Sequence, residues 1–210
     1  MLTVAALIVM VLLVLVVFSR HCNSLSGQLY DLVRTTPGYH AVMFHVYRLK
    51  KDGTLPLRGR LVARDVIEFA KMYNCPVCIS IGEASEQDKS DSVINADYLR
   101  KHGGANLNII LGDNMSARTT YEEVVEAVRL AQAKGWTRVL AIGELPHLPR
   151  IVKYWRQVKS NLTVHYWGTH VPWYYYLFEI IMIPAEILLP VESKRRNWAL
   201  NIAHRGSKKK

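Results

Sequence analysis

The stretch LGDNMSARTTYEE, residues 111–123, lies between an apolar run that ends at Leu111 and a helical pattern that begins at Tyr121. It therefore predicts the turn from a strand into a helix. In open parallel sheets ligands bind at such turns, because backbone N–H groups at the helix start are unpaired and the helix dipole favours an anion. The polar side chains of this turn suit a charged ligand: Asp113, Asn114, Ser116, Arg118, Thr119 and Thr120.

Helix capping is a second interpretation of the same turn. The spacings Thr119-x-x-Glu122 and Thr120-x-x-Glu123 both fit a capping box. In that motif a threonine and a glutamate at the helix start satisfy each other's backbone donors. Capping and anion binding therefore both stay open from this turn alone.

Short apolar runs and helical patterns alternate on both sides of the turn. Runs such as AVMF and NIIL are typical of strands that are buried on both faces. Apolar stripes at spacings of three and four are typical of helices that cover one face of a sheet. The alternation predicts an α/β fold, a Rossmann-like doubly wound parallel sheet of about five strands. The expected strands are 41–46, 77–81, 107–111, 139–143 and 162–167, and the expected helices include 62–73, 90–102, 121–131 and 148–155.

The chain begins with an apolar segment, residues 2–18, in which Thr3 is the one polar side chain. A helix of this length spans roughly 26 Å, close to the hydrocarbon core of a thin bilayer. No basic residue precedes the segment and no clear small-residue cleavage site follows it, which favours an uncleaved anchor over a signal peptide. We expect a transmembrane anchor at 1–20, a polar connector at 21–38 and the α/β domain at 39–168. Arg20 and Arg34 follow the anchor and favour a cytoplasmic domain.

A second hydrophobic segment, VPWYYYLFEIIMIPAEILLP, covers residues 171–190. Its three prolines and two glutamates disfavour a second span, because a carboxylate is costly in lipid. Residues 169–192 instead fit either a helix on the membrane surface or a helix that covers the domain.

The charge of the chain indicates anionic partners. The 27 Lys and Arg residues exceed the 17 Asp and Glu residues, giving a formal charge of +10, and a basic tail occupies residues 193–210. Such a tail can bind an anionic leaflet, so membrane lipid is an expected partner. Nothing in the sequence resembles a nucleic-acid-binding module, and no nucleic-acid partner is expected.

The pair Cys75-Pro-Val-Cys78 has the spacing of a redox motif, but it leads into a strand rather than opening a helix. A second cysteine pair that could complete a zinc site is missing, and no metal site is predicted. We expect two small buried side chains here. A disulfide between them stays open if the domain is exported.

The fourth expected strand ends in GELPHLPR, residues 143–150. His147 and Arg150 are three residues apart at a helix start and should face the same way, toward the edge that holds the 113–120 turn. Imidazole can act as an acid or base near neutral pH, and guanidinium can bind phosphate or carboxylate. A packed or capping role remains the alternative for His147. Arg60 opens a helix, where a cation is unfavourable unless it faces a bound anion.

Together these motifs resemble the family of bacterial envelope proteins represented by SanA, ElyC and YdcF, a domain of unknown biochemical function. The family begins with an apolar strand and an arginine that opens the first helix, here 41–46 and Arg60. The similarity covers residues 39–167. The further matches are Ser80-Ile81-Gly82 after the second strand, Ser116 to Glu123 in the third element and His147-Leu148-Pro149-Arg150 after the fourth strand.

The chain also departs from the family pattern. The glycines usual after the first strand are replaced by His45, Val46 and Tyr47. The Asn-Thr and Glu-Asn pairs of the family become Thr119-Thr120 and Glu122-Glu123. A divergent member of this kind could have changed or lost its ligand.

The resemblance implies an α/β domain behind one N-terminal membrane helix, facing away from the cytoplasm and associated with peptidoglycan or lipid-carrier metabolism. We therefore expect a site for a phosphate-bearing ligand, such as a polyprenyl-phosphate-linked intermediate. His147 would be the catalytic residue if there is chemistry. The expected ligand-binding residues are Arg60, Ser80, Gly82, Asp113, Ser116, Arg118, Thr120, Glu123 and Arg150.

Two alternatives stay open. The protein could be a non-catalytic assembly factor whose partners are envelope enzymes. It could also bind a nucleotide or S-adenosylmethionine, to which a soluble relative has been linked, although no G-x-G-x-x-G follows any strand. The sequence identifies no cofactor and no reaction, and it does not decide whether the protein is an enzyme.

Overall fold

The computed structural model describes residues 2–35, 38–45, 49–50, 52–80, 91–112 and 119–180. The chain divides into two compact units. The smaller unit comprises residues 1–19 and 172–210, and the larger unit comprises residues 20–171.

A five-stranded parallel sheet forms the centre of the larger unit, with the strand order β3-β2-β1-β4-β5. Phe44 of β1 pairs with Ile79 of β2 on one side and with Ile142 of β4 on the other, so the strand order reverses between β1 and β4. The α/β doubly wound sheet predicted from the sequence is therefore confirmed. The strands are β1 (Ala41–Phe44), β2 (Val77–Ile79), β3 (Ile109–Leu111), β4 (Arg138–Glu144) and β5 (Thr163–Thr169).

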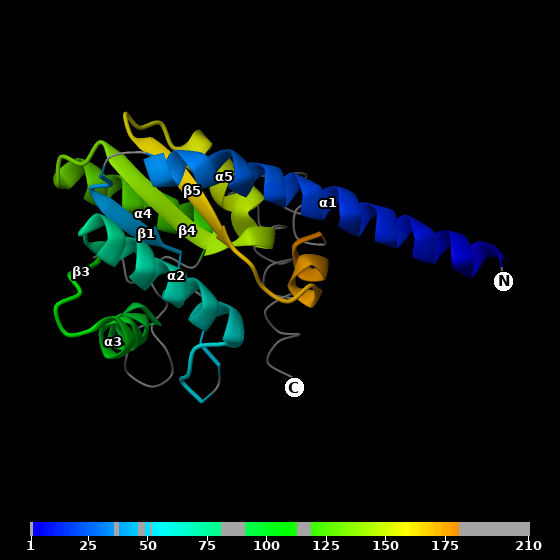
Figure 1. Cartoon of the computed structure of the whole chain (residues 1–210), viewed down its shortest axis with the longest axis horizontal. Coiled ribbons are helices and arrows are strands. Elements are labelled where there is room, and N and C mark those ends of the chain that lie inside the picture. The colour runs from blue at the N-terminus through cyan, green and yellow to red at the C-terminus, as the bar shows by residue number, and fades with distance from the viewer. Residues whose placement is uncertain are drawn as a thin grey trace. The chain divides into compact units, whose positions relative to one another are not determined.

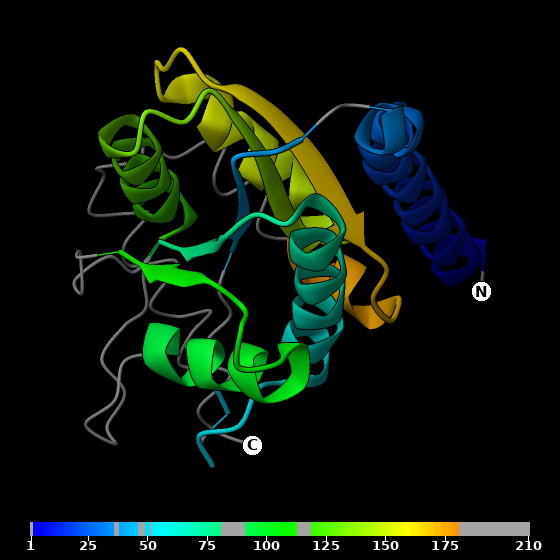
Figure 2. The ribbon, with the colours of Figure 1, turned by 60° about the vertical axis from the view of Figure 1, so that its left-hand side comes forward.

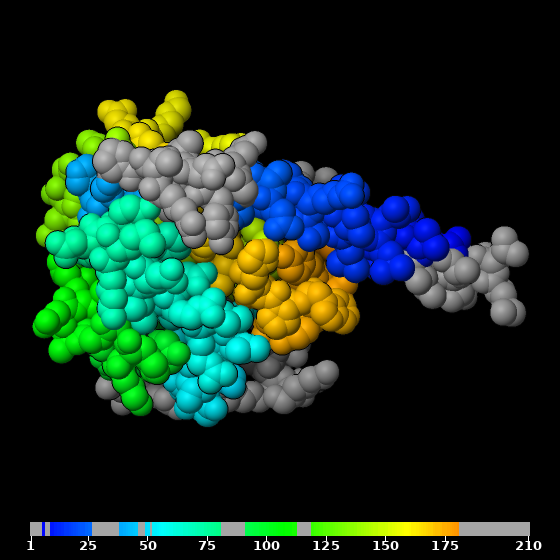
Figure 3. Space-filling model, viewed as in Figure 1, coloured from blue at the N-terminus to red at the C-terminus, as the bar shows by residue number. Residues whose placement is uncertain are grey.

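Helices cover both faces of the sheet (Figures 1 and 2). Helices α2 (Leu57–Tyr73) and α3 (Asp91–Gly103) lie on one face, and α4 (Thr120–Ala133) and α5 (Leu148–Gln157) lie on the other. The short 3₁₀ helix η1 (Leu145–His147) joins β4 to α5. Side chains of α2 and α3 form a continuous surface over their face (Figure 3). The core between the layers is fully buried at Phe44, Val62, Val66, Leu99 and Ile142.

The first helix, α1 (Leu2–Thr35), is longer than the predicted anchor. It continues through most of the segment that we expected to be a polar connector, because no proline interrupts the chain before Pro37. Its window Val9–Ser26 has a mean hydropathy of 1.7 and is long and apolar enough to cross a membrane.

The segment after β1 also differs from its prediction. We expected a loop up to Arg60, but α2 begins at Leu57, directly after Pro56 in an extended conformation. A proline is compatible with the start of a helix, because the first backbone N–H groups have no partner within the helix. The first turn of α2 therefore contains both Arg58 and Arg60.

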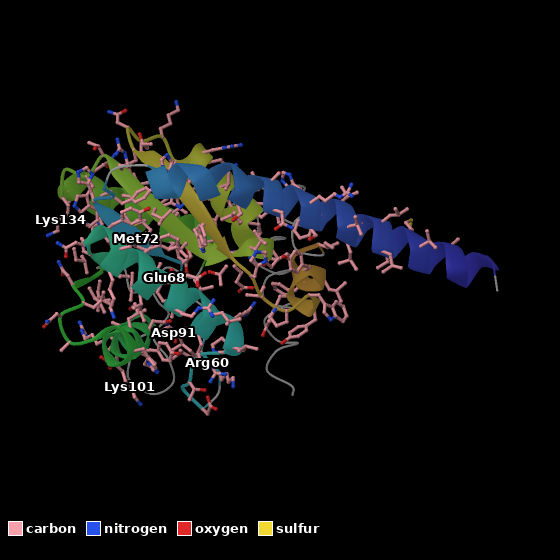
Figure 4. All side chains as sticks on the ribbon, viewed as in Figure 1. Arg60, Glu68, Met72, Asp91, Lys101 and Lys134 are labelled. Carbon is pink, nitrogen blue, oxygen red and sulfur yellow. The ribbon has the colours of Figure 1, made fainter. Side chains whose placement is uncertain are left out.

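A buried carboxylate attaches the edge strand β5 to α2. Asp65 Oδ2 accepts hydrogen bonds from Trp167 Nε1 at 3.0 Å and from Thr169 Oγ1 at 2.7 Å. A pocket of 220 Å³ lies beside this contact, and Glu68 and Met72 line it from α2 (Figure 4). Arg64 also donates to Asp65 Oδ1, so the charge of this carboxylate is compensated within the fold.

The capping box predicted at the start of α4 is confirmed for the first of the two spacings. Thr119 is the N-cap, its hydroxyl accepts from the Glu122 backbone N–H, and the Glu122 carboxylate accepts from the Thr119 N–H at 2.9 Å. Thr120 is then the first residue of the helix, and its hydroxyl is not needed for the cap.

Replacing Thr119 with alanine should lower the free energy of unfolding by about 1 kcal/mol, because a backbone donor at the helix start loses its partner. Thr119→Ser keeps the hydroxyl and should recover most of this loss. Urea unfolding of both variants in the full chain measures the difference. Equal stability of the alanine and serine variants would contradict the capping role.

All three cysteines of the chain are free and buried, including Cys75 and Cys78. Burial raises the pKa of the Cys75 thiol to about 11. Burial, together with the nearby Glu126 carboxylate, raises the pKa of the Cys78 thiol to about 12. The prediction of two small buried side chains is confirmed.

We expect native Cys75 and Cys78 to resist alkylation by iodoacetamide at pH 8, because the reactive thiolate is scarce and the sulfur atoms are shielded. Both should react fully once urea unfolds the chain. Mass spectrometry of the alkylated protein measures this, and rapid native labelling would contradict it.

The folded protein also holds the thiol protons of Cys75 and Cys78 above pH 9, while the unfolded chain releases them. The free energy of unfolding should therefore fall as pH rises above 9.

Candidate functional site

The candidate site lies at the carboxyl ends of β1 and β4, where the strand order reverses. Ligands of open α/β sheets bind at this position, because the loops on the two sides diverge and leave a crevice. The starts of α4 and α5 lie at the same edge of the sheet. The described polar residues gathered from these elements are His45, Arg58, Thr120, Glu123, Glu144, His147 and Arg150.

A hydrogen-bonded chain joins the starts of the two helices. Arg150 in the first turn of α5 donates to His147 Nδ1 from Nε at 3.1 Å and from Nη2 at 2.8 Å. On the other side of the ring, His147 Nε2 lies 3.3 Å from Thr120 Oγ1 at the start of α4. Residues far apart in the sequence are thus brought into one cluster, which we call the Thr120–His147–Arg150 cluster.

The donor and acceptor roles fix the tautomer of His147. A guanidinium only donates, so Nδ1 must accept, and the ring proton of the neutral imidazole then sits on Nε2. The Nε2–H group donates to the Thr120 hydroxyl oxygen. The hydroxyl hydrogen of Thr120 is left to donate elsewhere, so the cluster presents a hydroxyl and a guanidinium at the start of α4, and the imidazole joins the two.

His45 forms a second buried set of hydrogen bonds at the same edge. Trp155 Nε1 donates to His45 Nε2 at 3.1 Å, and an indole N–H can only donate. The proton of His45 therefore sits on Nδ1, which donates to Glu123 Oε2 at 3.3 Å. His45 is 2% exposed and the Glu123 side chain is 16% exposed, so the contact is a partly buried hydrogen bond that attaches the first turn of α4 to the end of β1 and to α5.

An ion pair joins α2 to the end of β4. Arg58 Nη1 in the first turn of α2 lies 3.4 Å from Glu144 Oε1, and the Glu144 side chain is 2% exposed. A buried carboxylate requires such a compensating charge. Part of the positive charge at this edge is therefore used within the fold.

The structure brings together three of the predicted site residues and gives others different surroundings. Thr120, His147 and Arg150 form the cluster, whereas Glu123 is held by His45. Arg60 is exposed on the first turn of α2 (Figure 4), and Ser80 is buried at the end of β2. The predicted residues Gly82, Asp113, Ser116 and Arg118 lie outside the described residues.

The sequence prediction missed three residues of this edge, His45, Arg58 and Glu144. His45 immediately follows a buried strand and Glu144 ends another, which is the position of functional residues in parallel sheets. That signal was present in the sequence. Arg58 precedes Arg60, the residue expected to open the helix, whereas α2 begins at Leu57 and includes both.

The described residues contain no group of three or more His, Cys, Asp or Glu side chains that could hold a metal ion. The side-chain donors at the start of α4 and α5 are the Thr120 hydroxyl and the Arg150 guanidinium. Comparison with known proteins found that no family model, no curated protein and no solved structure matches this chain.

Proposed function

We propose that this chain is a membrane-anchored cell-envelope protein that binds a phosphate-bearing ligand at the carboxyl edge of its sheet. The supporting observation is the Thr120–His147–Arg150 cluster, in which a hydroxyl, an imidazole N–H and a guanidinium meet at a helix start. The hydroxyl and the guanidinium can donate to a phosphate oxygen, and the imidazole orients both of them. The dipole of α4 adds a favourable field for an anion.

Arg150 contributes most to the proposed binding, because it is the charged member of the cluster. Its side chain is partly buried and contacts His147 through two nitrogen atoms, which orients the guanidinium plane. A hydrogen bond to a charged group contributes about 1.5–3 kcal/mol, so loss of one contact should weaken binding roughly 10- to 100-fold.

The proposed ligand is lipid-linked, such as a polyprenyl-phosphate-linked intermediate of envelope polymer synthesis. The apolar window of α1 is able to hold the chain at a bilayer, where such a substrate resides. The resemblance to SanA, ElyC and YdcF motivates the envelope role and an extracytoplasmic position of the domain.

The hydrogen bonds of His147 favour a donor role over a base role. Nδ1 accepts from Arg150 and Nε2 carries the proton, which is donated to Thr120, so the ring can donate to a phosphate oxygen or to a leaving group only by exchanging Thr120 for the ligand. The same observation supports a second candidate function, a non-catalytic binding or assembly factor that uses His147 only to orient a ligand.

These proposals are tested by measuring binding and turnover by the full chain in nanodiscs. The ligands are polyprenyl phosphate, its sugar conjugates and S-adenosylmethionine. Arg150→Ala should weaken binding of the lipid phosphates roughly 10- to 100-fold. Arg156→Ala is the matched control, because Arg156 is exposed at the other end of α5. His147→Gln separates the two candidates, since glutamine keeps an N–H donor but cannot transfer a proton.

Turnover that is lost in His147→Gln while binding is kept would establish an enzyme. Binding without turnover in the unmodified protein would favour the assembly factor. Binding of S-adenosylmethionine alone, or lipid-phosphate binding that Arg150→Ala leaves unchanged, would overturn the proposed phosphate site.

A further inference from the structure

We propose that residues 172–180 lie in the membrane interface beside the apolar part of α1, so that the chain contacts the bilayer through two segments. This inference concerns the smaller unit and does not depend on the proposed ligand site. The partner is the lipid surface itself, at the level where hydrocarbon meets headgroups. Five observations support it.

Exposed apolar side chains are concentrated in the smaller unit. Among the described residues of the larger unit, the exposed large apolar side chains are Leu57, Met72 and Val125. The smaller unit exposes many more, although it is the smaller of the two. They are Val9, Met10, Val11, Leu12, Leu13, Val14, Val16, Val17, Trp173, Tyr174, Leu177 and Phe178. Apolar surface concentrated in this way marks an interaction site.

A contact between two aromatic rings shows which part of α1 residues 172–180 lie beside. The rings of Phe18 and Tyr176 meet edge to face, with centroids 6.1 Å apart. Phe18 is the last residue of the uninterrupted apolar run, and Arg20 follows it closely. The segment therefore lies where the apolar run of residues 2–18 ends, and a span formed by that run places the segment at the membrane interface.

The local conformation of the segment exposes one apolar face. The chain turns at Trp173, where Tyr176 N donates to the Trp173 carbonyl at 3.0 Å, and residues 174–180 are helical. Tyr174, Leu177 and Phe178 are spaced three and four residues apart and are all exposed (orange segment in Figure 3). Such spacing places the three side chains on one side of a helix.

The carboxylate of the segment does not face outward with these side chains. Glu179 is 3% exposed, whereas Trp173 is 68% exposed and Tyr174 is 48% exposed. The cost of a carboxylate in lipid, which disfavours a second span, is thus avoided on the exposed face.

The composition of the exposed face selects lipid as the partner. Trp and Tyr are enriched at membrane interfaces, because their rings are apolar and carry a polar N–H or O–H group. Trp173, Tyr174 and the apolar Leu177 and Phe178 provide this combination beside the end of the apolar run of residues 2–18. A short amphipathic helix lying in the interface plane has the same pattern.

Site-directed spin labelling of the full chain in lipid nanodiscs tests the proposal. Cysteine is introduced by Tyr174→Cys or Phe178→Cys, and the control is Lys134→Cys, an exposed position in the larger unit (Figure 4). The three native thiols are buried, and the unmodified chain, labelled in parallel, shows whether any of them takes up label. Collisions of the label with oxygen, which concentrates in lipid, are compared with collisions with a water-soluble nickel chelate.

We expect the ratio of oxygen to nickel collisions to be several-fold higher at positions 174 and 178 than at position 134. Equal ratios at all three positions would place the segment in water and overturn the proposal. Low collision rates with both reagents would show a segment covered by protein, and would also overturn it. Repeating the measurement at a lower protein-to-lipid ratio distinguishes shielding of the label by a second protein copy from shielding by the bilayer. Shielding from the nickel chelate that disappears on dilution would indicate protein contacts.

Discussion

Replacing Gly112 with alanine is expected to destabilise the domain by about 3 kcal/mol or more, because the new methyl group has no space. A Cβ at this position would lie 1.8 Å from the Ser80 carbonyl oxygen and 3.0 Å from Glu126 Cγ. The backbone cannot move away easily, since Gly112 N donates to the Ile79 carbonyl at 2.8 Å. The ends of β2 and β3 would have to separate.

Gly135→Ala is the matched control for this prediction. Gly135 has a positive φ of 66°, but nothing lies within 4 Å of a Cβ added there. The cost at Gly135 should therefore be only the backbone strain of roughly 1–2 kcal/mol. Urea unfolding of the full chain measures both, and equal losses at the two positions would show that the approach of Gly112 to Ser80 is not close in solution.

Phe44→Ala should reduce the free energy of unfolding by about 3–5 kcal/mol, because it leaves a cavity in the middle of the sheet. Phe44 is fully buried and pairs with Ile79 and Ile142 on its two sides. The loss is a large part of the total stability of a typical domain, about 5–15 kcal/mol. His45 follows Phe44 directly, so the carboxyl edge should lose order with the core.

The control for the core prediction is Val125→Ala, which removes an exposed side chain on α4. Its effect should stay within about 0.5 kcal/mol, because no cavity forms. Thermal unfolding followed by circular dichroism compares the variants. A loss below about 1 kcal/mol for Phe44→Ala would mean that the core closes around the missing ring.

Much of the fold was predictable because it depends on local patterns. Strands such as AVMF, residues 41–44, are continuous apolar runs, and parallel strands with both faces covered require such runs. The amphipathic stripes of α2 and α4 likewise follow from burial of one helix face. The start of α2 was harder, because Pro56 and Gly59 are typical of loops but are also tolerated in a first helical turn.

The site was predictable only in part. His147 and Arg150 share one turn of chain, so spacing alone places them together. The contact of His147 with Thr120 depended on two loops meeting at one sheet edge, which the parallel sheet made predictable. The role of His45 could not be predicted in this way, because it depends on Trp155, more than a hundred residues away, and on β1 lying beside β4.

The pairing of β1 with β4 also has a consequence for the order of folding. Nearly half of the chain lies between Phe44 and its partner Ile142, and contacts so distant in sequence form slowly because a long loop must close first. During synthesis β1 leaves the ribosome early but cannot pair with β4 until β4 has been made. His45 can bond to Trp155 only later, when α5 has also been made. The carboxyl edge is therefore assembled only when almost all of the larger unit has left the ribosome, long after the apolar window of α1 has emerged.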